Sequence, residues 1–208
     1  MSGNSSWANP APAGLVALAV ACFTFYAILT GKVAGTAAPL LGCWVLGGFV
    51  VQFVVGLIEL MEGAITGGNV FLFFSAFFML VGGLEFFVKS YSAKLTGIAP
   101  DARIDGWAWM ALWFALWLWT PSYFKSPLVM IILILALDVA VPLVSLTDGG
   151  WLPKAQYAPI AGVFLLIAGI CGIYMSAAIV LNTEFKKVVL PVGSPIIKPV
   201  AAKIQQSA

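Results

Sequence analysis

The chain has 208 residues, of which 62% are hydrophobic and only 9% are charged, and its mean hydropathy is +1.06. A soluble domain of this size does not have such a composition, so the sequence predicts a polytopic membrane protein. The formal net charge of +2 favours neither nucleic acid nor another polyanion as a partner.

The residue types on which catalysis and metal binding usually rely are scarce. The chain contains no histidine, and its three cysteines lie in apolar stretches without a CxxC spacing. We found no glycine-rich loop with a lysine that could hold a phosphate. We therefore expect no enzymatic activity, no metal and no cofactor, and we expect the cysteines to behave as small buried hydrophobes.

Six apolar segments follow a short polar start, and each is close to the length that crosses a bilayer. We place them at about residues 13–30, 38–60, 68–88, 106–124, 127–147 and 157–181. The start has no basic region typical of a signal peptide, so the first segment is expected to remain as a span. The predicted fold is all-α, with six transmembrane helices in a compact bundle per protomer. The expected parts are an interfacial segment at 1–12, the transmembrane domain at 13–181 and a tail at 182–208.

Charge does not orient the predicted spans, because five basic residues fall on each side of the membrane. Small residues recur within the second, third and sixth segments and permit close helix packing. Such packing suits a tight bundle within one protomer and equally an interface between subunits. The glycines concerned are Gly42, Gly47, Gly48, Gly56, Gly82, Gly83, Gly162, Gly169 and Gly172.

Residues 9–14 have the features of a helix N-terminus. Asn9 is a good N-cap, and Pro10 fits the first helical position. Since prolines lack an amide proton, the amides of Asn9 and Ala11 are the expected donors at the positive end of the helix dipole, where an anion is favoured. Gly14 would let a second helix approach closely. A well-formed helix start that binds nothing explains the same residues.

The third segment carries an aromatic stripe, because Phe71, Phe74 and Phe78 share one helical face. Aromatic packing, either against lipid or in the protein core, explains such a stripe equally well. Ser75 lies among these rings, and its hydroxyl could contact a passing carboxylate.

Asp138 lies near the centre of the fifth predicted span. An isolated carboxylate there is costly, so its side chain should face protein or water. The position is consistent with a proton relay, an anion gate or a structural hydrogen bond. An ionised carboxylate would repel an anionic solute, and we therefore expect Asp138 to be protonated or away from any anion path.

Several of these patterns resemble the acetate uptake transporter family, the acetate/succinate permeases of bacteria, archaea and fungi. Residues 9–15 match the family's Asn-Pro-Ala/Val-Pro-Leu/Phe-Gly-Leu except at Ala13, and Leu18 replaces a family Phe. Residues 47–59 resemble its Gly-Gly…Gln…Gly-Leu-x-Glu pattern. In the third helix Ser75 replaces a glycine, and Asp138 departs from the small or hydroxyl residue that is usual there. The ending, Leu-Asn-x-x-Phe at 181–185 and Leu-Pro-x-Gly at 190–193, is the strongest match.

The resemblance implies a homohexamer in the cell inner membrane with cytoplasmic termini. Each protomer would have its own hydrophobically gated path for small monocarboxylates, chiefly acetate, either channel-like or proton-coupled, with the dicarboxylate succinate as a further candidate substrate. The implied constriction consists of Leu18, Phe74 and Leu137. The expected substrate contacts are Asn9, Ala11, Gly14, Leu15 and Ser75, and the candidate proton-linked residue is Asp138.

Two other functions are consistent with the same sequence. A urea or short-amide channel has a similar six-span hexameric architecture, and anion competition would distinguish it. A structural membrane protein would show no solute flux in liposomes.

Overall fold

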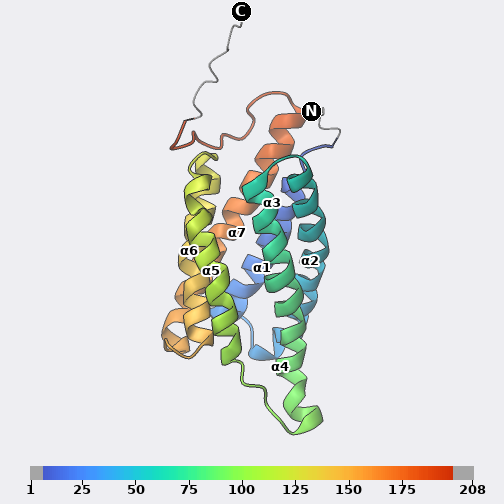
Figure 1. Cartoon of the computed structure of the whole chain (residues 1–208), viewed down its shortest axis with the longest axis vertical. Helices are drawn as coiled ribbons and strands as arrows, with labels where there is room; N and C mark the ends of the chain where they lie inside the picture. The colour runs from blue at the N-terminus through green and yellow to red at the C-terminus, as the bar shows by residue number, and fades with distance from the viewer. Residues whose placement is uncertain (1–6, 199–208) are drawn as a thin grey trace, which may run out of the picture.

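The computed structural model describes residues 7–198, which form a bundle of long helices with both described ends at the same end of the bundle (Figure 1). The first six residues of the predicted interfacial segment and the last ten of the predicted tail lie outside the described residues. No strand occurs between residues 7 and 198.

Six long helical stretches account for the bundle, which confirms the predicted all-α fold with six spans. They are α1 (Ala11–Leu29), α2 (Ala38–Met61) after the 3₁₀ turn η1 (Gly35–Ala37), a composite third helix, α5 (Arg103–Tyr123), α6 (Leu128–Asp148) and α7 (Lys154–Glu184). The composite helix joins α3 (Ile65–Phe73), the π-helical η2 (Phe74–Val81) and α4 (Gly82–Thr96).

Five of the six stretches are long and apolar enough to cross a membrane by length and composition alone. The sixth, α5, has the length, but a charged first turn and many tryptophans lower its hydropathy. Tryptophan is amphipathic and suits both protein contacts and the membrane interface. The residues concerned are Arg103, Asp105, Trp107, Trp109, Trp113, Trp117 and Trp119.

The prediction for the third span was wrong at its far end. It ended at residue 88, whereas α4 continues to Thr96, so Lys89 and Lys94 lie on a helix instead of in a loop. Residues 89–96 contain neither glycine nor proline, and nothing stops the helix before Gly97, which has a φ of +73°.

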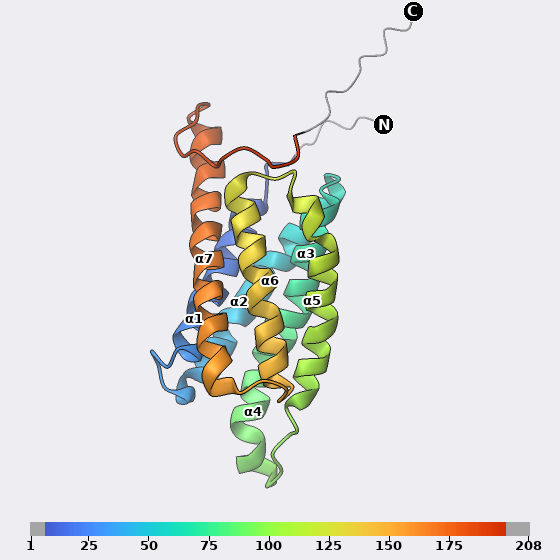
Figure 2. The same ribbon diagram turned by 90° about the vertical axis from the view of Figure 1, so that its left-hand side faces the viewer.

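The helices pack side by side in a ring, in the order α5, α6, α7, α1, α2 and the composite helix (Figures 1 and 2). The ring closes where α3 of the composite helix contacts α5. Apolar side chains fill its interior, including Leu15 of α1, Met79 of η2 and Leu165 of α7. The axis of this ring is therefore the place to look for internal spaces.

Most of the glycines bring helices together within the protomer. A Cβ at Gly162, Gly169 or Gly172 of α7 would press on α1, and one at Gly42, Gly48 or Gly56 of α2 would press on the composite helix. Gly47 and Gly82 have open space beside them. The sequence did not distinguish packing within one chain from an interface between subunits, and for the majority of the glycines the structure shows packing within the chain.

The segment after α7 crosses the end of the bundle as a strap over α6 towards α5 (Figure 2). Asn182 fixes its start, because its Oδ1 accepts from the amides of Val189 and Leu190 at 2.7 and 3.0 Å. Farther along, the amide of Ile197 donates to the carbonyl oxygen of Phe124 at 2.9 Å. Asn182 is therefore an anchor for the strap and not the final residue of a helix.

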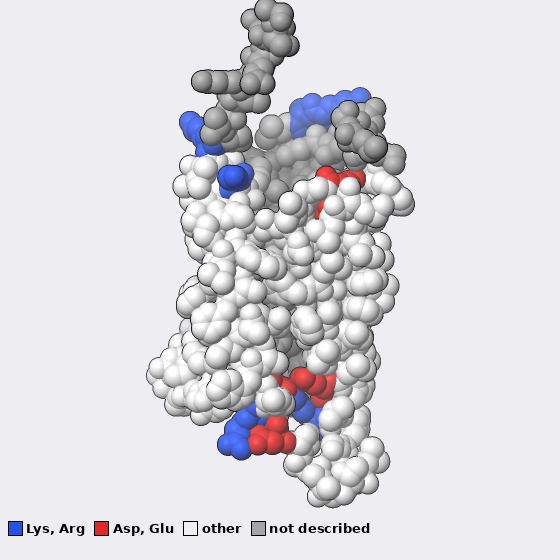
Figure 3. All heavy atoms as spheres, in the orientation of Figure 1, with Lys and Arg blue, Asp and Glu red and all other residues white. Residues whose placement is uncertain are grey.

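On the face shown in Figure 3, charged side chains gather at the two ends of the bundle, and the surface between them is uncharged. Such a band suits contact with hydrocarbon. In the loop before α5, the guanidinium of Arg103 lowers the pKa of Asp101 to about 2. This exposed pair therefore stays charged throughout the pH range of ordinary flux measurements.

Candidate functional site

Two internal chambers and an open vestibule follow one another along the helix ring. The upper chamber, at the end where α1 begins, has a volume of about 80 Å³ and reaches from Ala11 to Leu137. The lower chamber, of about 30 Å³, reaches from Leu18 to Val144. The vestibule, of about 560 Å³, opens at the other end of the bundle beside Lys89. Because each cavity shares wall residues with the next, the three form a line of spaces.

Leu18, Phe74 and Leu137 line both chambers and separate one from the other. They come from α1, η2 and α6, and their exposed fractions are 7%, 5% and 3%. The structure thus brings together the three residues that the family resemblance selected, although they lie on distant parts of the chain. The ring that they form is entirely apolar, so water and ions gain no polar contact in it.

Phe74 begins a π-helical segment, Phe74–Val81, within an otherwise α-helical span. A π-helix has a wider turn than an α-helix, and such segments often occur at functional sites. Phe71, Phe74 and Phe78 are buried, whereas 56% of Phe77 is exposed, so the stripe faces the interior of the bundle, a direction that the sequence left open. No pattern in the sequence indicated the π-helix itself.

A second narrow ring, which sequence reasoning missed, separates the lower chamber from the vestibule. Phe25, Phe78, Trp109 and Val144 line both spaces. The ring centroids of Phe25 and Phe78 lie 5.1 Å apart, and those of Phe78 and Trp109 lie 5.4 Å apart. These three aromatic side chains come from α1, η2 and α5, and no local sequence signal links them.

The upper chamber contains the polar groups of the path. Gln52 and Glu59 of α2 and Tyr123 of α5 line it, and each is at most 9% exposed. Gln52 Nε2 donates to the carbonyl oxygen of Gly14 at 3.2 Å. Glu59 packs against the backbone of Gly67, where a Cβ would collide with the carboxylate. Gln52 and Glu59 belong to the family pattern at residues 47–59, and the sequence gave no signal for Tyr123.

The predicted anion site at the start of α1 is only partly available for a ligand. Asn9 Oδ1 accepts from the amide of Ala11 at 2.9 Å, so this amide is already paired. Pro10 was predicted to be the first residue of the helix, but the helix begins one residue later, at Ala11. Ala11 and Leu15 line the upper chamber, whereas Gly14 packs against Phe71 and Val55. An anion-binding role for this helix start stays a prediction.

Ser75 is fully buried, and its hydroxyl donates to the carbonyl oxygen of Leu72 at 2.7 Å. It belongs to the wall of neither chamber. The structure therefore gives no support to the predicted contact between Ser75 and a solute, which stays a prediction.

Asp138 faces α5 and not the chambers. Thr120 Oγ1 lies 2.8 Å from Asp138 Oδ2, and Trp117 Nε1 donates to the carbonyl oxygen of Asp138 at 2.9 Å. The neighbouring Leu137 is the residue that lines both chambers. This geometry agrees with a position of Asp138 away from the line of spaces.

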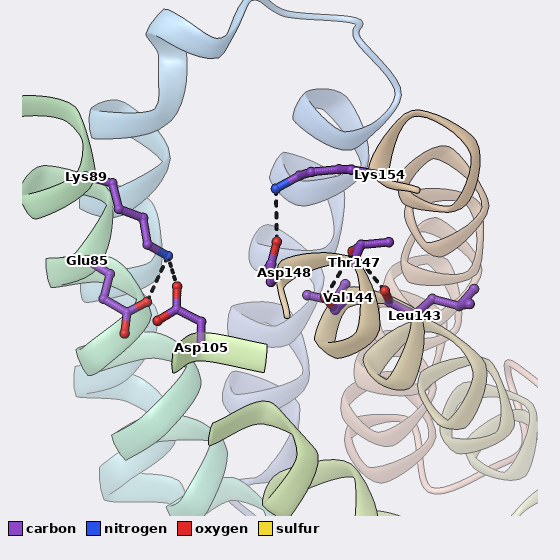
Figure 4. A network of polar contacts seen from close by, with 8 residues as sticks. All are labelled: Glu85, Lys89, Asp105, Leu143, Val144, Thr147, Asp148 and Lys154. Atoms are coloured by element: carbon purple, nitrogen blue, oxygen red, sulfur yellow. Dashed lines mark hydrogen bonds and ion pairs between the residues drawn. The ribbon is translucent and has the colours of Figure 1, made fainter. Parts of the chain in front are cut away.

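Ion pairs formed by residues of four helices lie in or beside the vestibule (Figure 4). Lys89 of α4 lies between Glu85 and Asp105, and it pairs with Glu85 at 3.2 Å. Lys154 of α7 pairs with Asp148 of α6 at 2.9 Å. Each ammonium group is held by a carboxylate, so the vestibule offers a polar, mixed-charge entrance and not a purely cationic one.

Comparisons with known proteins agree with this architecture. The model of the GPR1/FUN34/yaaH family matches residues 2–194. The chain is 28% identical over 193 residues to the succinate-acetate/proton symporter SatP of Escherichia coli (strain K12). The aligned region covers 92% of this chain and 98% of that protein. The same figures hold for the SatP proteins of Escherichia coli O157:H7 and Shigella flexneri.

A solved structure described as that of the bacterial acetate channel SatP has a similar fold. The TM-score is 0.77 at 24% sequence identity, and the match covers 90% of this chain and 100% of the other.

Proposed function

Because the chain belongs to the GPR1/FUN34/yaaH family, we propose that it moves small monocarboxylates, chiefly acetate, across a membrane through a path in each protomer. Relatives named as a succinate-acetate/proton symporter and an acetate channel support the proposal. The observation that carries it is the meeting of Leu18, Phe74 and Leu137 between two chambers on the axis of the helix ring.

The apolar ring would act as a size and charge filter. A solute that enters it loses part of its hydration shell, and burying an unpaired charge costs far more than burying a methyl group. Acetate has one carboxyl group and a methyl group that fits apolar walls. A dicarboxylate has two groups to desolvate, so the ring should pass it more slowly. Succinate is on this account a secondary substrate.

The mouth near the start of α1 would receive the solute at the upper chamber. Asn9, Ala11, Gly14 and Leu15 are the proposed contacts, because the positive end of the α1 dipole favours a carboxylate approaching from water. The side chain of Leu15 is 2% exposed and supplies an apolar wall.

Labelled-acetate uptake into proteoliposomes, with and without a pH gradient, tests the proposed function. We expect uptake above that of protein-free vesicles, and propionate should compete with it. A urea channel is the second candidate, since Gln52 Oε1 has no hydrogen-bond partner among the described residues and such an acceptor suits an amide donor. Uptake of labelled urea without uptake of acetate would favour that candidate, and uptake of neither solute above that of protein-free vesicles would refute both.

We further propose a homohexamer in the cell inner membrane with cytoplasmic termini. The exposed outer face is broad and apolar, and it includes Trp44, Leu118 and Ile170. We expect native mass spectrometry in detergent to show a hexamer as the main species. A stable monomer or dimer under the same conditions would contradict this assembly.

Asp138→Asn is expected to retain most of the acetate flux. Thr120 Oγ1 also lies 2.9 Å from the carbonyl oxygen of Leu116, and its single proton cannot serve both oxygens. A protonated Asp138 that donates to Thr120 satisfies both contacts, and an asparagine amide can donate in the same way. The measurement is acetate uptake at matched oligomer levels. Complete loss of uptake with an intact oligomer would instead identify Asp138 as a proton relay.

A further inference from the structure

Two hydrogen bonds from α5 hold one residue of α6, Asp138, which stands next to Leu137 of the constriction. Trp117 Nε1 donates to the carbonyl oxygen of Asp138 at 2.9 Å, and Asp138 Oδ2 lies 2.8 Å from Thr120 Oγ1. One bond involves the backbone of Asp138 and the other involves its side chain. Together they fix both the position of this turn of α6 and its rotation relative to α5.

The bond from Trp117 replaces one that α6 cannot make. Pro142 lies inside α6, four residues after Asp138, and it has no amide proton to donate to the Asp138 carbonyl oxygen. A proline inside a helix kinks or weakens the helix there. The indole of Trp117, which is half-exposed, supplies the missing donor. The helix is therefore tied to α5 at the same turn that its proline weakens.

This turn also contributes side chains to the line of spaces. Ile134, Leu137 and Val141 follow one another at helical spacing and line the chambers. Each of them is at most 5% exposed. Leu137 directly precedes Asp138, and Val141 directly precedes Pro142. Adjacent residues of a helix point about 100° apart, so a rotation of α6 that releases Asp138 also turns Leu137 away from the constriction.

We infer that Trp117 and Asp138 are positioning residues for the solute path, because their contacts across the α5–α6 crossing hold α6 at the rotation that presents Leu137 to the constriction. The inference rests on the proposed function and adds residues that set size selection without touching the solute. Neither residue belongs to the wall of a chamber or of the vestibule. An effect of their substitution on selectivity must therefore act through Leu137 and its neighbours on α6.

Trp117→Phe removes the indole donor and keeps an aromatic ring at the same place. The carbonyl oxygen of Asp138 then loses its donor, and this turn of α6 can move away from α5. Leu137 would withdraw from the constriction, which gives a dicarboxylate room that acetate does not need. We expect the succinate-to-acetate flux ratio in proteoliposomes to rise about fivefold, the factor that corresponds to one ordinary hydrogen bond.

Substitutions at Asp138 and Thr120 test the second contact. Asp138→Asn keeps a donor for Thr120 Oγ1, so its flux ratio should equal that of the wild type. Asp138→Leu removes the contact and should raise the ratio about fivefold. Thr120→Val removes the same contact from α5 and leaves the carboxyl group in place, so it should have the effect of Asp138→Leu. Trp117→Phe combined with Asp138→Leu should raise the ratio further than either change alone.

Ser145→Ala is the matched control for a loosened helix pair. Ser145 is fully buried, and its Oγ donates from α6 to the carbonyl oxygen of Gly106 in α5 at 2.7 Å. It lies about two turns beyond Leu137, on the other side of Pro142, and it lines neither chamber. Its midpoint of thermal unfolding should fall as in Trp117→Phe, whereas its flux ratio should stay at the wild-type value.

A wild-type flux ratio in Trp117→Phe would overturn the role of Trp117, and a wild-type ratio in both Asp138→Leu and Thr120→Val would overturn that of Asp138. Both results leave the proposed function standing as long as acetate is taken up. A raised ratio in Ser145→Ala would also overturn the inference, since any loosening of the helix pair would then suffice. If Trp117→Phe does not assemble, Thr120→Val and the two Asp138 variants decide the matter. Wild-type protein without acetate uptake would refute the proposed function, and the inference with it.

Discussion

Phe74→Ala is expected to raise the flux of succinate relative to acetate by about tenfold. Phe74 is the largest of the three side chains between the chambers, and it lies against Phe73 with ring centroids 4.6 Å apart. Trimming it joins the two chambers and gives a dicarboxylate room to keep part of its hydration. A single methylene group in an apolar pocket already alters discrimination by about 10–200-fold. Competitive uptake of labelled acetate and succinate measures the effect.

Two variants serve as controls for the constriction. Leu18→Ala removes less volume from the same ring, so its effect on the succinate-to-acetate ratio should be smaller. Phe77→Ala removes an identical phenyl group from the same π-helical segment, but 56% of Phe77 is exposed on the outer face. The succinate-to-acetate ratio of this variant should therefore not change. Because Phe→Ala at a buried site also costs stability, about 3–5 kcal/mol, uptake must be compared at matched oligomer levels. An unchanged ratio in Phe74→Ala would place the size filter elsewhere, with the ring of Phe25 and Phe78 as the next candidate.

Gly106→Ala is expected to destabilise the protomer by about 3 kcal/mol, because α5 and α6 have no room for a methyl group where they cross. A Cβ at Gly106 would collide with the backbone of Gly149 and would lie 2.8 Å from the carbonyl oxygen of Ser145. Neither obstacle is a flexible side chain, so the helices must separate. The separation would also weaken the 2.7 Å bond that Ser145 Oγ donates to the Gly106 carbonyl. For a chain of this size the midpoint of thermal unfolding should fall by roughly 10 °C.

Gly82→Ala is the matched control, since it makes the same chemical change in a helix where the added methyl meets nothing within 4 Å. Its unfolding midpoint should equal or slightly exceed that of the wild type, because alanine favours a helix more than glycine does. Thermal unfolding in detergent, followed by circular dichroism, measures both variants. Equal midpoints for Gly106→Ala and the wild type would mean that the α5–α6 crossing tolerates separation.

The sequence by itself determined the features that depend on one-dimensional or local physics. A bilayer requires about 20 consecutive apolar residues, so the number and approximate position of the spans follow from composition along the chain. The helix start just after Asn9 was recognisable to within one residue, because a capping side chain acts on amides only two or three residues away. That Phe71, Phe74 and Phe78 share one face followed from helical spacing, whereas the direction of that face and the π-helical segment that begins at Phe74 did not.

Only the tertiary structure decided where side chains from different helices meet. Leu137 lines both chambers while its neighbour Asp138 turns to Thr120, a difference of about 100° around one helix that depends on how α6 packs. The free atom of Gln52 is Oε1 because Gly14, on another helix, occupies Nε2. Glycines that could have served a subunit interface face α1 and the composite helix instead. In each case the outcome depends on contacts between distant parts of the chain, and hydropathy and spacing do not encode the rotation of one helix against another.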